Sequence, residues 1–537
     1  MATTQEKLAR SLSILKAIQD RGVRAIQVSQ HKELTRVHRE RLQKAGFLKP
    51  VIPGWYLQSR PDEKEGDTTS WYASMEAFVA AYAEARFGRD WQLNAEQSLL
   101  QHSGETSLAK QIQVHAPRAN NDVVQLPHGC SLLLYRIGRT SLSSDARSNS
   151  NGLRLIPLED CLFRIGPSFY ERHQEAAQIA LRRADVNELA RFVLKDGSTT
   201  IAGRFVGALQ AVGRVDDARL VQSAMEAAGH QVRVTNPFVA PLRALAGDRM
   251  ESPYVQRIRL MWTEMREPVL EAFEGVPIPA PKSVDSLLDD VRSRYVADAY
   301  NSLSIEGYRV TEDLIEKVRS GDWMPDGDDH DRRMRDTLAA KGYFEAYKSV
   351  LTLIGQTLEG SLNPGVQLRK ELPQWHLALF SSSVAAGIVT AVDLAGYRNR
   401  PIFIAGATHV PPPAESLRDC MPLLMELLEA EESGAVRAVL GHFVFVFMHP
   451  YIDGNGRLGR FIMNYMLTTA GYVWTIVPVQ QRAEYMAALE QASSARNIRP
   501  LAQMLARLVT EQTASPLSRE SQRTDSVWRA APFGSTG

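Results

Sequence analysis

One twelve-residue stretch decides the fold: His449-Pro-Tyr-Ile-Asp-Gly-Asn-Gly-Arg-Leu-Gly-Arg460. It follows an uncharged apolar run, Ala438 to Met448, and precedes a second helical segment, Leu458 to Thr469. Two helices joined by a tight glycine-bearing turn place backbone N–H groups at a helix N-terminus, which favours an anion. The stretch therefore predicts a phosphate-binding turn between two helices.

The residue types in this turn are those that phosphate chemistry uses. Gly454 and Gly456 allow the backbone to approach a phosphate closely. Arg457 and Arg460 lie three residues apart and reach one ligand from one helical face. Asp453 offers a hard oxygen ligand suited to Mg²⁺ among phosphates. These residues predict a site for the phosphate chain of a nucleotide.

His449 ends the first helix and is a candidate general base, with an unperturbed pKa near the working pH. Together with the turn it predicts transfer of a phosphorus-containing group from a nucleotide. The alternative is a solvated glycine turn between two core helices.

The stretch resembles the signature of the Fic family, His-Pro-Phe-x-Asp-Gly-Asn-Gly-Arg-x-x-Arg, with Tyr451 where Phe is usual. We expect Tyr451 to pack in the core. The resemblance implies a protein adenylyltransferase (AMPylator), a nucleotidyltransferase that uses ATP and Mg²⁺. It would transfer AMP to a Ser, Thr or Tyr hydroxyl of a target protein. UMP transfer and phosphocholine transfer stay open, since the choice of base is set outside the stretch. The kinase-like branch of the family departs from the pattern at the second glycine.

The resemblance also assigns roles to the residues of the turn. His449 removes the proton of the target hydroxyl, and Asp453 is the metal ligand. Asn455 supports catalysis by stabilising charge at the α-phosphate. The nucleotide-binding set is Gly454, Asn455, Gly456, Arg457 and Arg460.

A second pattern, Ser302-Leu-Ser-Ile-Glu306-Gly307, follows a helical stretch from Val284 to Ala299. It resembles the inhibitory pattern of the family, Ser/Thr-x-x-x-Glu-Gly/Asn, whose functional members here are Ser302, Glu306 and Gly307. The resemblance implies that Glu306 reaches Arg460 and occupies the position that the γ-phosphate needs, so regulation acts in cis. The alternative is a surface glutamate that pairs within its own helix.

A third segment, Gly396 to His409, alternates strand-like residues around Gly406 and precedes Val410-Pro-Pro-Pro. It resembles the flap hairpin of the family, whose edge strand holds a target segment by β-augmentation. The alternative is a purely structural hairpin. Beyond the turn, four residues either line a nucleoside pocket or pack in the core: Asn464, Tyr465, Arg482 and Tyr485. We interpret His442 as a core histidine.

Composition limits the remaining possibilities. The chain has 537 residues and a net charge of +1, so its total charge favours neither nucleic acid nor membrane. Cys130, Cys161 and Cys420 are far apart and read as free thiols in a reducing compartment. The N-terminus lacks the apolar core of a signal peptide, and no apolar run approaches the ~20 residues of a membrane span. We expect a cytoplasmic protein without a membrane partner.

Residues 1–60 predict a winged helix-turn-helix. A helix from Leu8 to Gln19 and a second from Lys32 to Ala45 precede two strand-like runs around Pro53-Gly54. The second helix is basic, and we name Arg36, Arg39 and Lys44 as tentative contacts to the backbone of double-stranded DNA. A protein-binding or structural winged helix is the alternative.

Residues 61–235 predict an α+β region that becomes helical from Arg172 to His230. A helix from Ser74 to Phe87 precedes strand-like runs at 112–116 and 130–137, which we expect to pair. The order of elements in residues 1–230 resembles an AbiE-type antitoxin and regulator domain, which implies a transcriptional or autoregulatory role.

The expected domain order continues with a proline-rich connector over 236–282, a Fic catalytic domain over 283–510 and a disordered tail over 511–537. The fold class is mainly α, with a helical Fic core and a small β-hairpin flap behind the winged helix and the α+β region. Two other functions stay open: a DNA-binding regulator of antitoxin type with the Fic domain as sensor, and removal of AMP with Glu306 orienting water. The target protein is unknown, and a homo-oligomer is compatible with the sequence.

Overall fold

The computed structural model describes residues 3–59, 61, 69–239, 242, 251–280, 283–320, 330–404 and 406–514. The chain divides into two compact units. The first comprises residues 1–257 together with 402–410, and the second comprises residues 258–401 and 411–537. Both are rich in helix, in agreement with the predicted fold class.

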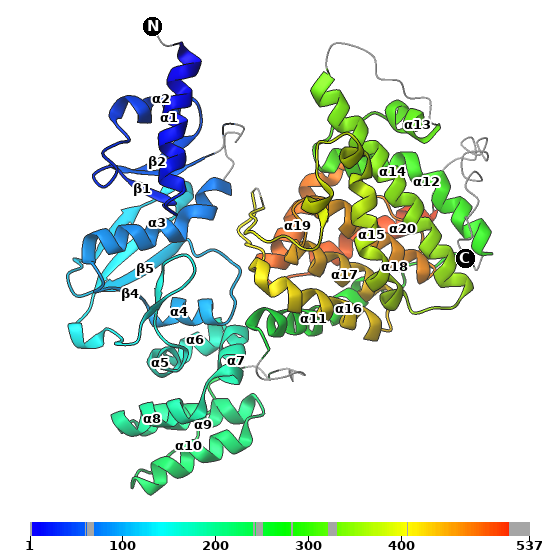
Figure 1. Ribbon diagram of the computed structural model, residues 1–537. Helices are drawn as coiled ribbons and strands as arrows, with labels where there is room; N and C mark the ends of the chain where they lie inside the picture. The colour runs from blue at the N-terminus through cyan, green and yellow to red at the C-terminus, as the bar shows by residue number, and fades with distance from the viewer. Residues whose placement is uncertain are drawn as a thin grey trace, which may run out of the picture. The chain divides into compact units, whose positions relative to one another are not determined.

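The first unit opens with two helices and a small sheet (Figure 1). Thr3 caps the first helix, because its side chain accepts the Glu6 N–H while the Glu6 carboxylate accepts the Thr3 N–H. The three strands pair in the antiparallel order β1-β3-β2, and Gly54 turns the β2–β3 hairpin at φ 81°. The elements are α1 (Thr4–Gln19), β1 (Ala25–Gln27), α2 (Arg36–Lys44), β2 (Leu48–Ile52) and β3 (Trp55–Gln58).

The predicted second helix begins four residues later than Lys32. Residues 28–34 form successive turns instead, closed by bonds such as that from the Leu34 N–H to the His31 carbonyl at 3.0 Å. The opening region, as far as residues 3–59 show it, therefore has two helices and a hairpin. Two helices followed by a hairpin agree with the predicted order of elements, and the winged helix-turn-helix itself stays a prediction.

A four-stranded sheet follows, packed against helix α3 (Thr69–Phe87). Its order is β4-β5-β7-β6, and only the β5–β7 pair is parallel. The predicted pairing of the runs near residues 112 and 131 is thus confirmed. The other elements here are β4 (Gln92–Leu93), α4 (Ala95–His102), β5 (Gln111–Ala116), β6 (Asp122–Gln125), β7 (Ser131–Arg136), β8 (Arg147–Ser148) and β9 (Arg154–Leu155).

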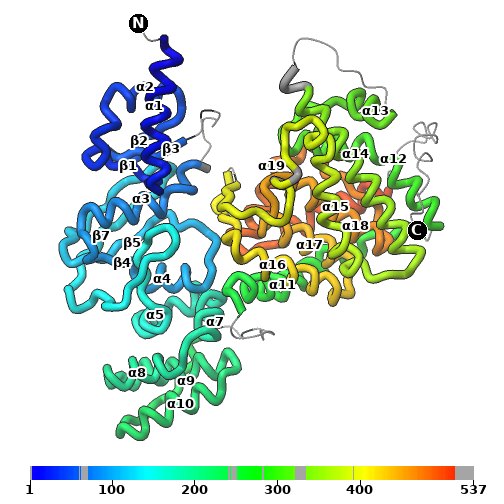
Figure 2. Tube along the Cα trace, in the orientation of Figure 1, coloured from blue at the N-terminus to red at the C-terminus, as the bar shows by residue number. Residues whose placement is uncertain are grey.

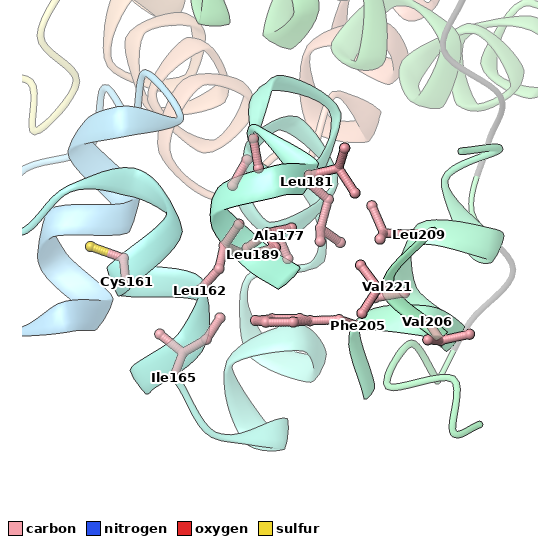
Figure 3. Packing of buried hydrophobic residues seen from close by; sticks show 14 of the residues in the cluster. Cys161, Leu162, Ile165, Ala177, Leu181, Leu189, Phe205, Val206, Leu209 and Val221 are labelled. Carbon is pink, nitrogen blue, oxygen red and sulfur yellow. The ribbon is translucent and has the colours of Figure 1, made fainter. Parts of the chain in front are cut away.

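Short helices complete the first unit, and α8, α9 and α10 lie side by side (Figure 2). Their apolar faces meet in one core, in which Leu162, Leu181 and Phe205 are fully buried (Figure 3). Gly207 on α9 lets the backbone at Thr235 approach so closely that a Cβ would lie 2.3 Å from the Thr235 carbonyl oxygen. The helices are α5 (Leu158–Arg164), α6 (Pro167–Arg172), α7 (Gln174–Arg183), α8 (Val186–Asp196), α9 (Thr199–Ala211) and α10 (Val215–Ala227).

The second unit is a helical assembly in which α14 pairs with α15 and α17 with α18. Helix α11 (Pro253–Ala272) begins in the first unit and belongs to the second from Ile258 onward. The other helices of the second unit are α12 (Val284–Ile305), α13 (Glu312–Ser320), α14 (His330–Glu359), α15 (Pro364–Ala385), α16 (Leu417–Ala430), α17 (Gly434–Met448), α18 (Asn455–Thr469), α19 (Arg482–Ser494) and α20 (Arg499–Ala514). Short 3₁₀ turns of the chain span Pro127–Gly129, Arg139–Ser141, Ala391–Leu394, Ala414–Ser416 and Val479–Gln481.

The predicted connector over 236–282 contains a helix that belongs to the helical core. Helix α11 buries Ile258, Met261 and Met265, which recur at helical spacing. Arg266 Nε pairs with Glu431 at 2.9 Å, which fixes α11 against the region between α16 and α17. The second unit therefore starts before Ser283. Of the expected tail, 511–514 close helix α20, and 515–537 lie outside the described residues.

The expected flap hairpin is not formed by the described residues of 396–409, which contain no strand. The segment pairs instead within the first unit, through a bridge between Ser107 and His409 and a bond from the Val410 N–H to the Thr106 carbonyl at 2.8 Å. Pro401 and the prolines from 411 onward lack the N–H donors that a longer ladder needs.

Candidate active site

The turn between α17 and α18 is built as the sequence predicted. His449 leaves α17 in a left-handed conformation (φ 49°, ψ 60°), and Gly454 precedes α18 at φ 88°, a value that favours glycine. The two helices pack closely at Gly459, where a Cβ would lie 2.7 Å from Nδ1 of His442. His442 is fully buried and bonds to the Tyr485 hydroxyl at 2.8 Å, so it is a core histidine as expected.

Asn455 holds the turn together rather than pointing its amide outward. Its Oδ1 accepts the Tyr451 N–H at 2.9 Å and its Nδ2 donates to the Tyr451 carbonyl at 2.8 Å. The Tyr451 ring is buried and stacks on His376 with ring centroids 3.8 Å apart. The expected core position of Tyr451 is confirmed, and the side chain of Asn455 is a support of the loop. Because both ends of the Asn455 side-chain amide bond to Tyr451, Asn455 can contact a ligand only through its backbone N–H.

The N-terminus of α18 already faces a carboxylate. A Cβ at Gly456 would lie 2.1 Å from Oε1 of Glu306, so only glycine permits this approach. The first N–H groups of a helix have no acceptor within the helix, and they favour an anion beside them. Glu306 therefore occupies the position that a phosphate oxygen would seek.

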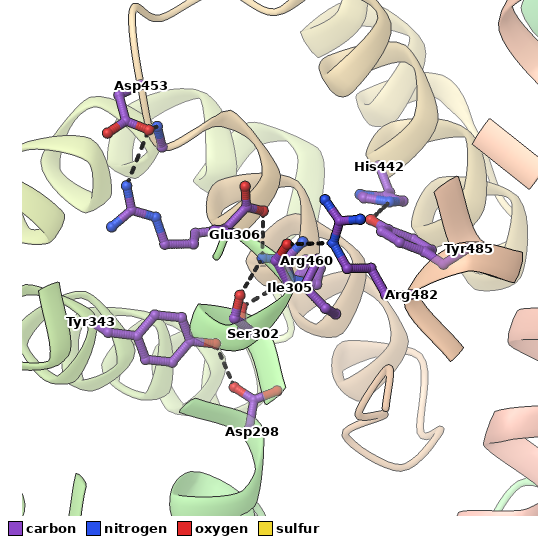
Figure 4. A network of polar contacts seen from close by, with 12 residues as sticks. Asp298, Ser302, Ile305, Glu306, Tyr343, His442, Asp453, Arg460, Arg482 and Tyr485 are labelled. Carbon is purple, nitrogen blue, oxygen red and sulfur yellow. Dashed lines mark hydrogen bonds and ion pairs between the residues drawn. The ribbon is translucent and has the colours of Figure 1, made fainter. Parts of the chain in front are cut away.

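Arg460 is the main partner of the inhibitory pattern (Figure 4). Its Nη2 donates to Glu306 Oε1 at 2.8 Å and to the Ser302 carbonyl at 2.9 Å, and its Nε donates to Ser302 Oγ at 2.9 Å. Burial opposes the charged form of Arg460, but Glu306, Tyr485 and Tyr343 together outweigh it and raise the pKa of Arg460. The expected contact between Glu306 and Arg460 is therefore present in this structure.

The end of α12 positions this carboxylate. The helix stops at Ile305, whose carbonyl accepts Nε of Arg482 at 2.8 Å, and Gly307 leaves it in a left-handed conformation at φ 85°. Two turns before Ile305, the buried Asp298 accepts the Tyr343 hydroxyl at 2.6 Å. Ser302, Glu306 and Gly307 thus share one helix end, and Arg482 supports that end rather than a nucleoside pocket.

Arg457 lies buried beside the same helix end. Its guanidinium stands 5.2 Å from the ring centroids of both Tyr308 and Phe380, and Nη2 is 3.3 Å from Oδ1 of Asp453. Its Nε is buried without a hydrogen-bond partner among the residues that the structure describes. A buried donor without a partner beside a helix N-terminus fits an anionic ligand.

Asp453 fits the metal role by its exposure and chemistry. Its side chain is 63% exposed, and Oδ1 also accepts the Gly454 N–H at 2.6 Å. No cluster of three or more His, Cys, Asp or Glu side chains suited to a metal occurs in the part of the chain described. A Mg²⁺ ion here would take its other ligands from nucleotide phosphates and water, as this ion commonly does.

The surroundings of His449 correct the expected pKa. Burial lowers the pKa of His449 to about 4, and the nearby Arg398 cation acts in the same direction. Nδ1 lies 3.4 Å from the Val446 carbonyl, which only accepts, so a proton on Nδ1 leaves Nε2 as the basic atom. The imidazole is accordingly neutral near pH 7 and retains its capacity to accept a proton.

The remaining candidates for a nucleoside pocket pack in the core. Asn464 Nδ2 donates to the Thr475 carbonyl at 3.0 Å, and the Tyr465 hydroxyl bonds to Thr357 at 2.8 Å. The Tyr485 hydroxyl forms its hydrogen bond with the buried His442. Sequence reasoning missed other residues of the site, because its signals were confined to contiguous patterns: Tyr308, His376, Phe380 and Arg398.

Residues 369–467 match the model of the Fic/DOC family. The chain carries a Fic/DOC domain. Protein adenylyltransferase Fic of Drosophila grimshawi is 31% identical over 222 residues, which cover 40% of this chain and 41% of that protein. The same-named protein of Drosophila virilis is 30% identical over 222 residues, with 40% and 41% covered. The chain thus spans about two fifths of the length of these curated relatives.

Two solved structures also resemble the chain. Fic-1 from C. elegans has 16% sequence identity and a TM-score of 0.36, covering 64% of this chain and 91% of that chain. A Fic family protein from Desulfovibrio desulfuricans G20 has 21% identity and a TM-score of 0.34, covering 49% and 76%. The family match itself contains the whole turn, whereas Ser302 and Glu306 precede the matched part of the Fic/DOC domain.

None of the described helices combines the length and apolar character that a membrane crossing requires. All three cysteines are buried free thiols, and burial raises the pKa of Cys161 and of Cys420.

Proposed function

We propose that this protein is an adenylyltransferase that moves AMP from ATP to a hydroxyl of a target protein, and that Glu306 restrains it in cis. One observation carries the proposal: Arg460, at the N-terminal end of α18, is held by Glu306 and Ser302 while His449 stands at the other side of the same turn. The similarity to proteins named protein adenylyltransferase Fic supports the choice of AMP.

The reaction proceeds by one displacement at the α-phosphorus. Nε2 of His449 accepts the proton of the target hydroxyl, and the hydroxyl oxygen forms a bond to the α-phosphorus. The bond from that phosphorus to the oxygen bridging to the β-phosphate breaks, and pyrophosphate leaves. The N–H groups of Asn455 and Gly456, at the start of α18, stabilise the charge that develops on the phosphate oxygens.

The two arginines and the acidic residue of the turn bind the rest of the nucleotide. Arg457 and Arg460 hold the β- and γ-phosphates and so keep pyrophosphate as the leaving group. Asp453 would hold Mg²⁺, which neutralises phosphate charge when bound. To reach the phosphates, Arg460 leaves Glu306 and Arg457 leaves Asp453, so the observed pairs describe the restrained enzyme.

The test compares incorporation of label from α-³²P-ATP and γ-³²P-ATP into the protein itself and into proteins of a cell extract. Wild type, Glu306→Gly and Glu306→Gly/His449→Ala are measured side by side. We expect label from the α-position only, raised by Glu306→Gly and abolished by the second change. Label from the γ-position would make the protein a kinase. Pre-labelled protein that loses its AMP on incubation with wild type, but keeps it with Glu306→Gly, would indicate that the glutamate instead orients water for removal of AMP.

A second candidate function is DNA binding by the first unit. For both candidate functions we propose that the protein acts in the cytoplasm. Helix α2 leaves Lys44 exposed and carries Arg36, 83% exposed in its pair with Glu40. Fewer basic side chains of α2 are available to DNA than the sequence predicted, because two of them bond within the fold. Arg39 donates to the Leu34 carbonyl at 2.7 Å, and Arg41 donates to the Lys7 carbonyl at 3.0 Å.

Fluorescence anisotropy of a labelled DNA duplex with the full chain tests this function. Binding should weaken with salt, and replacing Lys44 by Gln should reduce the slope of log K against log salt by about 1. DNA binding that does not depend on salt, or no binding at all, would rule out this second candidate function.

A further inference from the structure

His449 sits in a backbone conformation that the rest of the protein must enforce. Its φ of 49° lies in the left-handed region, which residues other than glycine seldom adopt. Such a conformation persists only where surrounding contacts over-determine it. His449 also ends α17, where carbonyl groups lose their intrahelical donors.

Arg398 supplies donors to three consecutive carbonyls at this point. Its Nε donates to the His449 carbonyl at 2.8 Å, and its Nη2 donates to the Met448 carbonyl at 3.3 Å. Its own backbone N–H donates to the Pro450 carbonyl at 2.8 Å. The carbonyls before, at and after the candidate base are therefore all fixed by one residue.

The same guanidinium also bonds to the chain just before and just after residues 401–411, which include much of the segment that resembles the flap. Nη1 donates to the Arg400 carbonyl at 3.1 Å, and Nη2 donates to the Pro412 carbonyl. Arg400 precedes and Pro412 follows residues 401–411. One side chain thus ties the backbone of the base to the chain on either side of residues 401–411.

This arrangement is costly and specific. Arg398 is 3% exposed, and the acceptors found for its guanidinium in the described residues are backbone carbonyls. Burial lowers the pKa of Arg398 to about 10, and the charge of Glu415 offsets this only in part. A planar fork of five N–H donors meets four carbonyls at once, whereas a lysine has one compact ammonium.

We propose that Arg398 is a positioning residue that fixes the backbone of residues 448–450 relative to the Arg400 and Pro412 carbonyls, and so aims the His449 imidazole at the target hydroxyl. This role rests on the proposed transferase function. The hydrogen bonds of the Arg398 guanidinium in the described residues go to carbonyl groups and not to the imidazole, on which Arg398 acts only through its charge.

The kinetic test uses Arg398→Lys, Arg398→Met and Arg398→Ala in the Glu306→Gly protein, with α-³²P-ATP. We expect kcat to fall about 100-fold with the KM for ATP unchanged, because misplacing a reacting group costs about that much while the phosphate grip stays intact. Guanidinium chloride at low millimolar concentration should restore part of the rate of Arg398→Ala. The control Arg400→Met changes an exposed side chain, and it should keep the parent rate.

Hydrogen exchange gives a readout that does not depend on transferase activity. Peptides covering 445–452 should exchange faster in Arg398→Lys and Arg398→Met than in the parent, while peptides from α19 should not change. If the parent transfers no AMP, the proposed function fails but the exchange result still decides the role of Arg398. Unchanged exchange at 445–452, or a kcat that both variants keep within about threefold, would overturn the role. Exchange that rises throughout the second unit would also overturn it, as the mark of a general structural role.

Discussion

Substitutions that weaken the Glu306–Arg460 contact partly or fully should raise the rate of AMP transfer to matching degrees. The carboxylate makes one charged hydrogen bond to Arg460, at 2.8 Å, and its side chain is 33% exposed. A hydrogen bond between charged groups contributes about 1.5–3 kcal/mol, and solvent access favours the lower part of that range, about 2 kcal/mol. Removal of this bond should therefore shift the equilibrium toward the open site about 30-fold.

Two substitutions separate the charge from the contact. Glu306→Gly removes both, so the initial rate of AMP incorporation should rise about 30-fold, whereas Glu306→Gln keeps an acceptor oxygen and should raise it about fivefold. Glu312→Gln on α13 is the matched control, because Glu312 is exposed, and it should leave the rate unchanged. Rates are taken from α-³²P-ATP at saturating ATP. A Glu306→Gly rate within about twofold of wild type would refute the restraint.

Three further predictions follow from neighbouring groups. Because burial lowers the pKa of His449 to about 4, kcat/KM for ATP should be level from about pH 6 to about pH 8; a midpoint near 6.5 would contradict this. Tyr308→Leu removes a ring that faces Arg457 in the restrained state, so the wild-type rate should rise about threefold. A fall in that rate would show that the ring orients Arg457 for phosphate instead. Burial raises the pKa of Asp298 to about 6, so the folded state binds this proton more tightly than the unfolded chain does. The Asp298 proton should then contribute about 1 kcal/mol of stability on going from about pH 7 to about pH 5, while buried neutral histidines such as His449 act in the opposite direction. In thermal melts at the two pH values, acidification should therefore destabilise Asp298→Asn by about 1 kcal/mol more than wild type.

The turn could be predicted because its determinants are contiguous in sequence. Gly454 supplies a left-handed φ, and Gly456 makes room for an anion at a helix N-terminus. Arg460 follows at a helical spacing that the sequence shows directly. Glu306 lies 154 residues before Arg460, and only the resemblance to a family pattern connected the two.

Other parts of the site depend on tertiary contacts that no local pattern reveals. The pKa of His449 follows from burial, and Arg398 meets His449 from 51 residues away. The flap was misjudged because alternation predicts a strand but does not specify its partner, and His409 pairs with Ser107. Helix α11 was missed although its pattern is local. Ile258, Met261 and Met265 recur at helical spacing, but the nearby prolines favoured a connector.

The most direct test of AMP transfer under Glu306 restraint is tandem mass spectrometry of the Glu306→Gly protein and an added cell extract after incubation with ATP. The account predicts AMP on a Ser, Thr or Tyr hydroxyl, with one pyrophosphate released per AMP, less of it with wild type and none with Glu306→Gly/His449→Ala. A phosphate adduct, or AMP that persists in the double variant, would contradict it.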